Sequence, residues 1–303
     1  MKILICDGLD SEAVKQLEND GHDITLKKGI SPDELNQLIA DTECVVVRSA
    51  TKIKAPALEH AKNLKLVVRA GVGLDNVDAV AAQAKGITVQ NTPTATTISV
   101  AEHAFGLMLA LARHIPQGNQ STKEGKWERK TLEGTELYKK TIGILGFGRI
   151  GQEVAKRAKA FHMRVIACDR HLDPEMVEAL EIESGDLDTL LNEADYLSLH
   201  LPLDDSTRNL FNADRLGKMK KGARIINTAR GGLIDEQALA DAIKSGQIGG
   251  AAIDVFAKEP TEKDNPLFNL PQCICVPHLG ASTAEGQLRA GAEVARIIRE
   301  FNA

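Results

Sequence analysis

The stretch Thr141–Gly151, TIGILGFGRIG, joins a short apolar run to a helical pattern through three glycines. The run TIGIL is typical of a buried strand, and the following QEVAKRAKAF has the spacing of an amphipathic helix. Gly146, Gly148 and Gly151 permit a tight turn and let a pyrophosphate approach the amino end of that helix. A lone GxGxxG is weak evidence, but this position between a strand and a helix favours a dinucleotide-binding loop.

The next apolar run, MRVIAC, ends at Asp169. A carboxylate at this point can accept hydrogen bonds from the adenosine ribose hydroxyls of a dinucleotide. It would also repel the 2′-phosphate of NADP, although the neighbouring cation Arg170 could meet such a phosphate. The sequence therefore predicts NAD as the cofactor. The alternative is that the three glycines serve helix–strand packing and that Asp169 is a solvated residue at a strand end.

Short apolar runs alternate with helical patterns on both sides of this stretch. Residues 1–91 contain five such runs and four helical patterns, a rhythm typical of a parallel sheet covered on both faces. From residue 141 onward six apolar runs follow: TIGIL, MRVIACD, DYLSLHL, ARIINT, GAAIDV and CICVP. The sequence therefore predicts an α/β protein with two doubly wound parallel sheets, a flavodoxin-like domain and a Rossmann domain.

Two segments lie outside this alternation. Ser99–His114 has a helical pattern and precedes a polar loop, residues 117–140, that holds Trp127 and several cations. The helix either forms a contact between subunits or is buried within one chain. The last stretch, Ser282–Ala303, is helical and could pack on either domain.

Composition excludes several classes of protein. Lys and Arg number 37 and Asp and Glu 42, so the net charge of −5 gives no general reason to bind nucleic acid. The most apolar stretch, Val100–Ala112, is shorter than the ~20 residues that a bilayer span needs. The five cysteines lack a CxxC pair, which indicates reduced thiols, and no export signal is visible. We expect a cytoplasmic protein with neither nucleic acid nor membrane as a partner, and we assign no metal ligand.

Three ionisable residues follow successive predicted strands: Arg230 after ARIINTA, Glu259 after AAIDVFAK and His278 after CICVP. Taken singly, each is explained by a surface or capping role. In an open α/β sheet, however, the carboxyl ends of the strands border one crevice, so the three side chains are expected to converge. Arginine can bind a carboxylate with two donors, and histidine beside a carboxylate can exchange a proton near neutral pH. With a nicotinamide site, these are the parts of a 2-hydroxy-acid dehydrogenase.

The runs GFGRIG, NTARGGLIDEQAL, AAIDVFAKEP and PHLGAST resemble the signature segments of the D-isomer-specific 2-hydroxyacid dehydrogenases, and the resemblance covers nearly the whole chain. RSATKI, RAGVGLDNVD and SVAEHAFGLMLALAR resemble a branch of that family that acts on a phosphorylated 2-hydroxy acid. The family inserts its NAD-binding domain into its substrate domain. The resemblance therefore implies a substrate domain of residues 1–95 and 283–303 and an NAD-binding domain of residues 96–282.

The resemblance also implies roles for individual residues and a homodimer formed through the helix and loop at residues 99–140. The catalytic residues would be Arg230, Glu259 and His278. Substrate contacts would come from Arg48, Ser49, Arg69, Ala70, Gly71, Arg230 and His278. Cofactor contacts would come from Val72, Gly146, Gly148, Arg149, Ile150, Gly151, Asp169, Leu201, Pro202, Thr228, Ala229, Arg230, Asp254, His278, Gly280 and Ala281.

Two departures from the family pattern stand out. Ala95 and Thr96 occupy positions where the family often has Gly-Asn, which puts one substrate contact in question. The sequence ends at Ala303, so we expect no C-terminal regulatory domain of the kind found in longer members of this branch. Two alternatives stay open: a dehydrogenase for glycerate, glyoxylate or D-lactate, and an NAD(H)-sensing binding protein like the corepressors that resemble this family.

Overall fold

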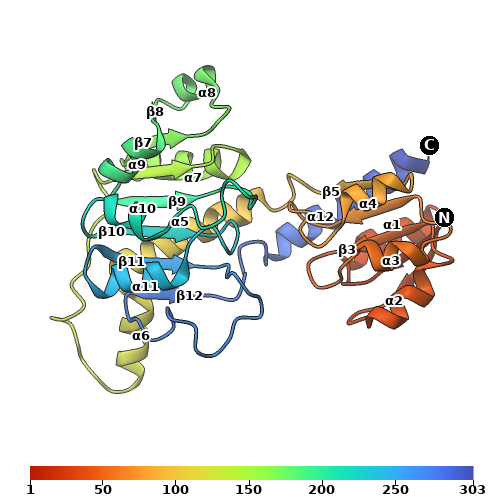
Figure 1. Cartoon of the computed structure of the whole chain (residues 1–303), viewed down its shortest axis with the longest axis horizontal. Coiled ribbons are helices and arrows are strands. Elements are labelled where there is room, and N and C mark those ends of the chain that lie inside the picture. Colours follow the sequence, from red (N-terminus) through yellow and green to blue (C-terminus); the bar gives the residue numbers. More distant parts are fainter. Residues whose placement is uncertain (303) are drawn as a thin grey trace. The chain divides into compact units, whose positions relative to one another are not determined.

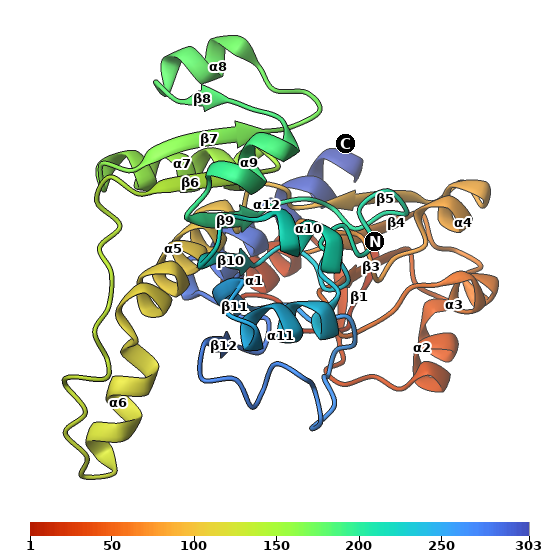
Figure 2. The same ribbon diagram turned by 60° about the vertical axis from the view of Figure 1, so that its left-hand side comes forward.

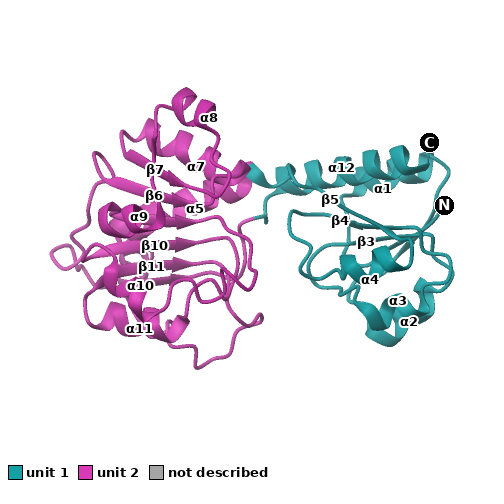
Figure 3. Cartoon of the chain, turned by 45° about the horizontal axis from the view of Figure 1, so that its top comes forward, with its two compact units in different colours: residues 1–97, 281–303 teal, residues 98–280 magenta. Residues whose placement is uncertain are grey.

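The structure, a computed structural model, describes residues 1–302 and divides into two compact units (Figure 3). Unit 1 comprises Met1–Thr97 together with the residues from Ala281 onward, and unit 2 comprises Ile98–Gly280. The chain thus leaves unit 1 after its fifth strand and returns to it for the last helix. The family resemblance implied that the chain crosses between the domains at residues 95 and 283.

Unit 1 contains a five-stranded, entirely parallel sheet in the order β2-β1-β3-β4-β5 (Figure 1). Side chains alternate between two cores: one lies under α1 and α12 and the other under α2, α3 and α4. Burial on both faces explains the uninterrupted apolar run CVVV of β3. The elements are β1 (Lys2–Ile5), α1 (Ser11–Asn19), β2 (Asp23–Leu26), α2 (Pro32–Ile39), β3 (Cys44–Val47), α3 (Ala55–His60), β4 (Leu66–Arg69), α4 (Ala79–Ala84), β5 (Thr88–Asn91) and α12 (Ala284–Asn302).

Unit 2 contains a seven-stranded parallel sheet in the order β12-β11-β10-β9-β6-β7-β8. The six predicted strands are present, and the sequence missed the seventh, β8, because it has two exposed residues and no apolar run. The strands are β6 (Thr141–Leu145), β7 (Arg164–Cys168), β8 (Glu183–Ser184), β9 (Tyr196–Leu199), β10 (Ala223–Asn227), β11 (Ile248–Ile253) and β12 (Cys273–Cys275). The helices are α5 (Thr97–Arg113), α6 (Ile115–Lys123), α7 (Arg149–Ala160), α8 (Pro174–Ala179), α9 (Leu187–Glu193), α10 (Ala213–Lys218) and α11 (Glu236–Lys244).

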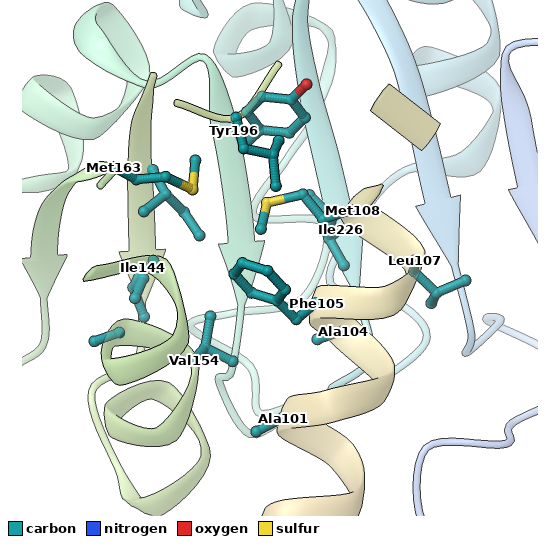
Figure 4. Packing of buried hydrophobic residues seen from close by; sticks show 14 of the residues in the cluster. Ala101, Ala104, Phe105, Leu107, Met108, Ile144, Val154, Met163, Tyr196 and Ile226 are labelled. Carbon is teal, nitrogen blue, oxygen red and sulfur yellow. The ribbon is translucent and has the colours of Figure 1, made fainter. Parts of the chain in front are cut away.

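One face of helix α5 is buried within the chain, as one of the two interpretations of this apolar segment predicts. Phe105 and Met108 pack with Tyr196 of β9 and Ile226 of β10, and α7 covers the same face of the sheet (Figure 4). The opposite face is covered by α9, α10 and α11. Among the helices of residues 1–302, none has both the length and the apolarity that a membrane span requires.

The polar segment after α5 differs from the prediction of a continuous loop. Residues 115–123 form α6, which extends away from the sheet of unit 2 (Figure 2), and the chain is back at the sheet by Thr135, whose hydroxyl lies 3.1 Å from that of Tyr196. His114, with a φ of 53°, separates α6 from α5, and Pro116 at the start of α6 favours the first helical turn. Only Ser121 of α6 is buried. The pattern of residues contains no helical signal here because this helix has no apolar stripe.

Candidate active site

The glycine-rich loop between β6 and α7 has two glycines that the chain itself requires and one that faces open space. A Cβ on Gly146 would lie 2.5 Å from the carbonyl oxygen of His200, and one on Gly151 would lie 2.3 Å from that of Gly146. A Cβ on Gly148 would meet nothing within 4 Å. Gly148 is also the N-cap of α7 and supplies no side-chain cap, so the N–H groups of the first turn, from Arg149 onward, suit a phosphate.

Asp169 stands at the carboxyl end of β7, next to this loop. Its Oδ2 accepts the Phe147 N–H at 2.6 Å, and its Oδ1 accepts the His171 N–H at 2.9 Å. A carboxylate oxygen can accept a second hydrogen bond, so both oxygens retain capacity for ribose hydroxyls. Arg170, in contrast, donates to the Ser206 hydroxyl at 2.7 Å. The loop, the helix terminus and Asp169 therefore fit an NAD dinucleotide.

Arg230 lies on a tight turn after β10 that the buried Asn227 side chain holds. Asn227 Nδ2 donates to the Arg230 carbonyl at 2.9 Å, and Asn227 Oδ1 accepts the Ala229 N–H at 3.1 Å. The next residue, Gly231, touches the loop after β11, since a Cβ there would lie 1.8 Å from the Phe256 carbonyl oxygen. Only glycine permits this approach, which brings the Arg230 turn against the loop that carries Glu259.

Glu259 and His278 form a hydrogen-bonded pair. Glu259 Oε2 lies 2.8 Å from His278 Nδ1, and Glu259 Oε1 accepts the Phe256 N–H at 2.9 Å. Because an ionised carboxylate can only accept, we assign the proton of the ring to Nδ1. Nε2 is then the ring atom that can exchange a proton with a substrate. The His278 side chain is 47% exposed, which leaves it accessible.

Electrostatic interactions favour the form of this pair in which His278 is protonated and Glu259 is ionised. The hydrogen bond to Glu259 raises the pKa of His278, helped by the charges of Glu259 and Asp254, against the lowering effects of burial and of Arg230. Burial pushes the pKa of Glu259 upward, but the hydrogen bonds from His278 and the Phe256 N–H and the charge of Arg230 together hold that pKa below its usual value. Arg230 is therefore close enough to act on both partners.

Asp254, at the end of β11, fixes the loop that carries His278. Its carboxylate is fully buried and accepts the N–H groups of Leu279, at 2.7 Å, and Gly280, at 2.8 Å. Its carbonyl accepts the His278 N–H at 2.9 Å. His278 has a φ of 54°, an uncommon value for a residue other than glycine, and these bonds hold it there. His103 Nε2 of α5 lies 3.4 Å from the same carboxylate, and the sequence alone predicted no role for this histidine.

The predicted substrate residues of unit 1 lie at the carboxyl ends of β3 and β4. Arg69 Nε donates to the Arg48 carbonyl at 3.2 Å, so the structure brings these two arginines together. Ser49 is exposed, Ala70 is buried, and Gly71 has a φ of 152°. Asp7 and Asn76, which the sequence did not single out, hold the Arg48 loop. The sequence offered little reason to single them out, because Asp7 follows β1 and Asn76 lies in a turn far along the chain from Arg48.

The remaining predicted contacts are distributed over both units. Leu201 is half-buried, the Pro202 carbonyl accepts the Thr207 hydroxyl at 2.8 Å, and Thr228 is buried. In unit 1, the Val72 carbonyl accepts Asn91 Nδ2 and the Ala281 carbonyl accepts Gln287 Nε2 at 3.1 Å.

Ala95 and Thr96, the two departures from the family pattern, are both buried in unit 1. The Ala95 carbonyl accepts Arg289 Nε at 2.8 Å, so this backbone is tied to α12.

Comparisons with known proteins agree with this geometry. Residues 105–280 match the model of the D-isomer specific 2-hydroxyacid dehydrogenase NAD-binding domain. The chain is 48% identical over 301 residues to D-3-phosphoglycerate dehydrogenase of Methanocaldococcus jannaschii, covering 99% of this chain and 57% of the relative. It is 49% identical over 304 residues to hydroxypyruvate reductase of Thermotoga maritima, covering 99% and 98%. The solved structure of the TT0316 protein of Thermus thermophilus is similar, with a TM-score of 0.89, 36% identity and coverage of 97% and 94%.

The fold and the glycine-rich loop are those of a Rossmann NAD-binding domain. The chain belongs to the D-isomer specific 2-hydroxyacid dehydrogenase family, and residues 105–280 are its NAD-binding domain. The chain spans a little over half the length of the phosphoglycerate dehydrogenases that it matches, but nearly all of the hydroxypyruvate reductase.

Replacing Asp169 tests the assignment of the ribose site. Asp169→Ala removes the acceptor and the charge that repels a 2′-phosphate, so the KM for NAD should rise about tenfold, and the preference for NAD over NADP should shrink. Asp169→Asn keeps an oxygen for the Phe147 N–H and should retain more NAD use than Asp169→Ala. Steady-state kinetics with both cofactors measures this, and an unchanged NAD/NADP ratio in both variants would contradict the assignment.

Replacing Glu259 tests the hydrogen-bonded pair through the pH profile. Glu259→Gln removes the carboxylate that stabilises charged His278, so the pKa of His278 should fall. Reduction of a 2-oxo acid requires charged His278, and its rate should therefore decline at a lower pH than in the wild type. The measurement is kcat/KM against pH, with Glu262→Gln, an exposed neighbour, as the control. If the Glu259→Gln profile stays where the wild-type profile lies, the two residues do not act as a pair.

Proposed function

We propose that this protein catalyses the NAD-dependent interconversion of D-3-phosphoglycerate and 3-phosphohydroxypyruvate, the first step of serine biosynthesis. The observation that carries the proposal is the Glu259–His278 hydrogen bond, with Arg230 close enough to affect the pKa of both residues, in an NAD-binding domain. The relatives named D-3-phosphoglycerate dehydrogenase, at 46–48% identity over nearly the whole chain, support the substrate.

Three side chains of unit 2 have separate roles in the proposed reaction of a 2-hydroxy acid. In oxidation, neutral His278 accepts the hydroxyl proton at Nε2 while Glu259 stabilises the resulting charge on the ring. In reduction, charged His278 returns that proton to the carbonyl oxygen. The Arg230 guanidinium binds the substrate carboxylate with two donors and stabilises the developing charge on the C2 oxygen. Bound NAD supplies the acceptor for the hydride from C2.

The cofactor contacts are assigned on the same basis. The loop from Gly146 to Gly151 and Asp169 would hold the pyrophosphate and the ribose. The remaining contacts, Val72, Leu201, Pro202, Thr228, Ala229, Asp254, Gly280 and Ala281, come from the family resemblance. The exposure of the His278 side chain and the open space in front of Gly148 leave room for a cofactor, which supports these assignments.

Hydroxypyruvate is the second candidate for the 2-oxo acid. The hydroxypyruvate reductase of Thermotoga maritima matches this chain over 98% of its own length. The two acids share C1 and C2 and differ in the phosphate on C3, so Arg230 and His278 would treat them alike. The residues that distinguish the phosphorylated acid from hydroxypyruvate would then be cations such as Arg48 and Arg69 of unit 1.

Comparing the two acids tests the substrate and also the NAD-sensing alternative, because a binding protein would not turn over either acid. The wild type should show a higher kcat/KM for 3-phosphohydroxypyruvate than for hydroxypyruvate. Arg48→Ala and Arg69→Ala should each reduce that preference by about tenfold or more, since a phosphate carries nearly two negative charges at neutral pH. A wild type that prefers hydroxypyruvate would overturn the proposed substrate. A preference retained in both variants would place the phosphate elsewhere.

We also propose a homodimer built through the helix and loop of residues 99–140. Outside its own core, this region exposes large side chains, since Ile115, Trp127 and Tyr138 are 56%, 83% and 52% exposed. Helix α6 extends away from the sheet, and Ser121 is its only buried residue (Figure 2). A second copy of the chain would cover these side chains. A cytoplasmic location stays a prediction of the sequence.

Sedimentation equilibrium tests the dimer. The wild type should have the mass of two chains, and Trp127→Glu should dissociate it at micromolar concentration, since a charge would enter the proposed apolar contact. Phe268→Glu, at a residue 41% exposed outside this segment, is the control and should leave the mass unchanged. A wild-type protein with the mass of one chain would contradict the proposed dimer.

A further inference from the structure

The loop that carries Arg48 is held from two sides by side chains outside the predicted site. Asp7, two residues after the end of β1, accepts the Arg48 N–H at 2.7 Å, the Thr51 N–H at 3.1 Å and the Thr51 hydroxyl at 2.5 Å. The buried Asn76 donates from Nδ2 to the carbonyls of Arg48, at 3.0 Å, and Thr51, at 2.6 Å. The backbone between Arg48 and Thr51 therefore has fixed partners at both ends.

Arg69 is tied to the same loop. Its Nε donates to the Arg48 carbonyl at 3.2 Å, and its guanidinium lies over Gly71. A Cβ on Gly71 would lie 1.8 Å from Nη1 and 2.5 Å from Cζ of Arg69. The φ of Gly71 is 152°, a value that other residues rarely adopt. Arg69 can occupy this place only because residue 71 has no side chain.

We propose that Asp7 and Gly71 are positioning residues that fix Arg48 and Arg69 for binding the phosphate of the substrate, an inference that rests on the proposed function. Gly71, which the family resemblance gave as a substrate contact, would then act through Arg69. The Asp7 carboxylate accepts hydrogen bonds from backbone N–H groups and a hydroxyl, and so fixes the Arg48 loop. Gly71 admits the Arg69 guanidinium, which supports the Arg48 carbonyl in turn. Because the Arg48 backbone and the Arg69 guanidinium are held in place before the substrate arrives, the site loses less conformational entropy when it binds the phosphate.

If Asp7 and Gly71 served only to stabilise the fold, replacing them would lower the stability of the protein. Because a positioning role could lower stability too, the test must measure substrate binding. For a positioning residue, the KM for 3-phosphohydroxypyruvate should rise while kcat, the Kd for NADH and the pH profile stay near their wild-type values. The preference for 3-phosphohydroxypyruvate over hydroxypyruvate should fall with it.

Gly71→Ala is the first variant, with Gly86→Ala as its matched control. Gly86 also lies in unit 1 and has a positive φ, 73°, but a Cβ there would meet nothing within 4 Å. Both variants carry backbone strain, and only Gly71→Ala displaces Arg69. The KM for 3-phosphohydroxypyruvate should rise at least about tenfold in Gly71→Ala and less than about twofold in Gly86→Ala. Equal KM values in the two variants would overturn the role of Gly71.

Asp7→Asn is the second variant, with Asp10→Asn as its control. Asn retains one oxygen acceptor but loses the other and the charge, so the Arg48 loop should loosen without loss of the fold. Asp10 also accepts backbone N–H groups, those of Glu12 and Ala13, and Asn caps a helix as well as Asp does. The KM should rise about five- to tenfold in Asp7→Asn and stay constant in Asp10→Asn. A normal KM in Asp7→Asn would overturn the role of Asp7.

The outcomes separate this inference from the proposed function. If the wild type prefers hydroxypyruvate, the proposed substrate is wrong, and the claim that these arginines bind the substrate phosphate is wrong with it. The KM for hydroxypyruvate in the same four variants then shows whether Asp7 and Gly71 position the arginines for another acid. If the wild type prefers the phosphorylated acid and neither Gly71→Ala nor Asp7→Asn changes its KM, the substrate stands and the positioning inference fails.

Discussion

The buried carboxylate of Asp254 is the interaction on which the proposed proton-transfer site depends. None of its surface is exposed, so its charge must be satisfied inside the protein, and the N–H groups of Leu279 and Gly280 do this. The chain can offer both N–H groups only if the residue before them turns sharply. His278 makes that turn with its left-handed backbone, and the ring is thereby directed to Glu259.

Close backbone approaches at glycines give the site its precision. Gly146 lies against the His200 carbonyl, Gly151 against Gly146, and Gly231 against the Phe256 carbonyl. Each contact joins backbone segments at distances that no other residue allows. Unit 1 uses the same device at Gly71, where the missing side chain makes room for a guanidinium rather than for backbone. Such contacts hold functional side chains in place without long polar networks.

The two units carry different parts of the proposed recognition. Unit 2 holds Arg230, Glu259 and His278, which in the proposed mechanism act on the carboxylate, the C2 oxygen and its proton, atoms that every 2-hydroxy acid has. Unit 1 holds Arg48 and Arg69, whose charges suit the group that distinguishes one such acid from another.

The sequence by itself determined the alternation of strands and helices, the glycine-rich loop and the placement of three ionisable residues at strand ends, because periodicity and turn chemistry are local properties. It did not reveal α6, which has no apolar stripe, or β8, whose two residues are exposed at the sheet edge. Only the tertiary structure decided that Asp7 holds the Arg48 loop and that His103 adjoins Asp254. The partners in each pair lie far apart in the chain, and their polar groups meet only after the sheets have formed.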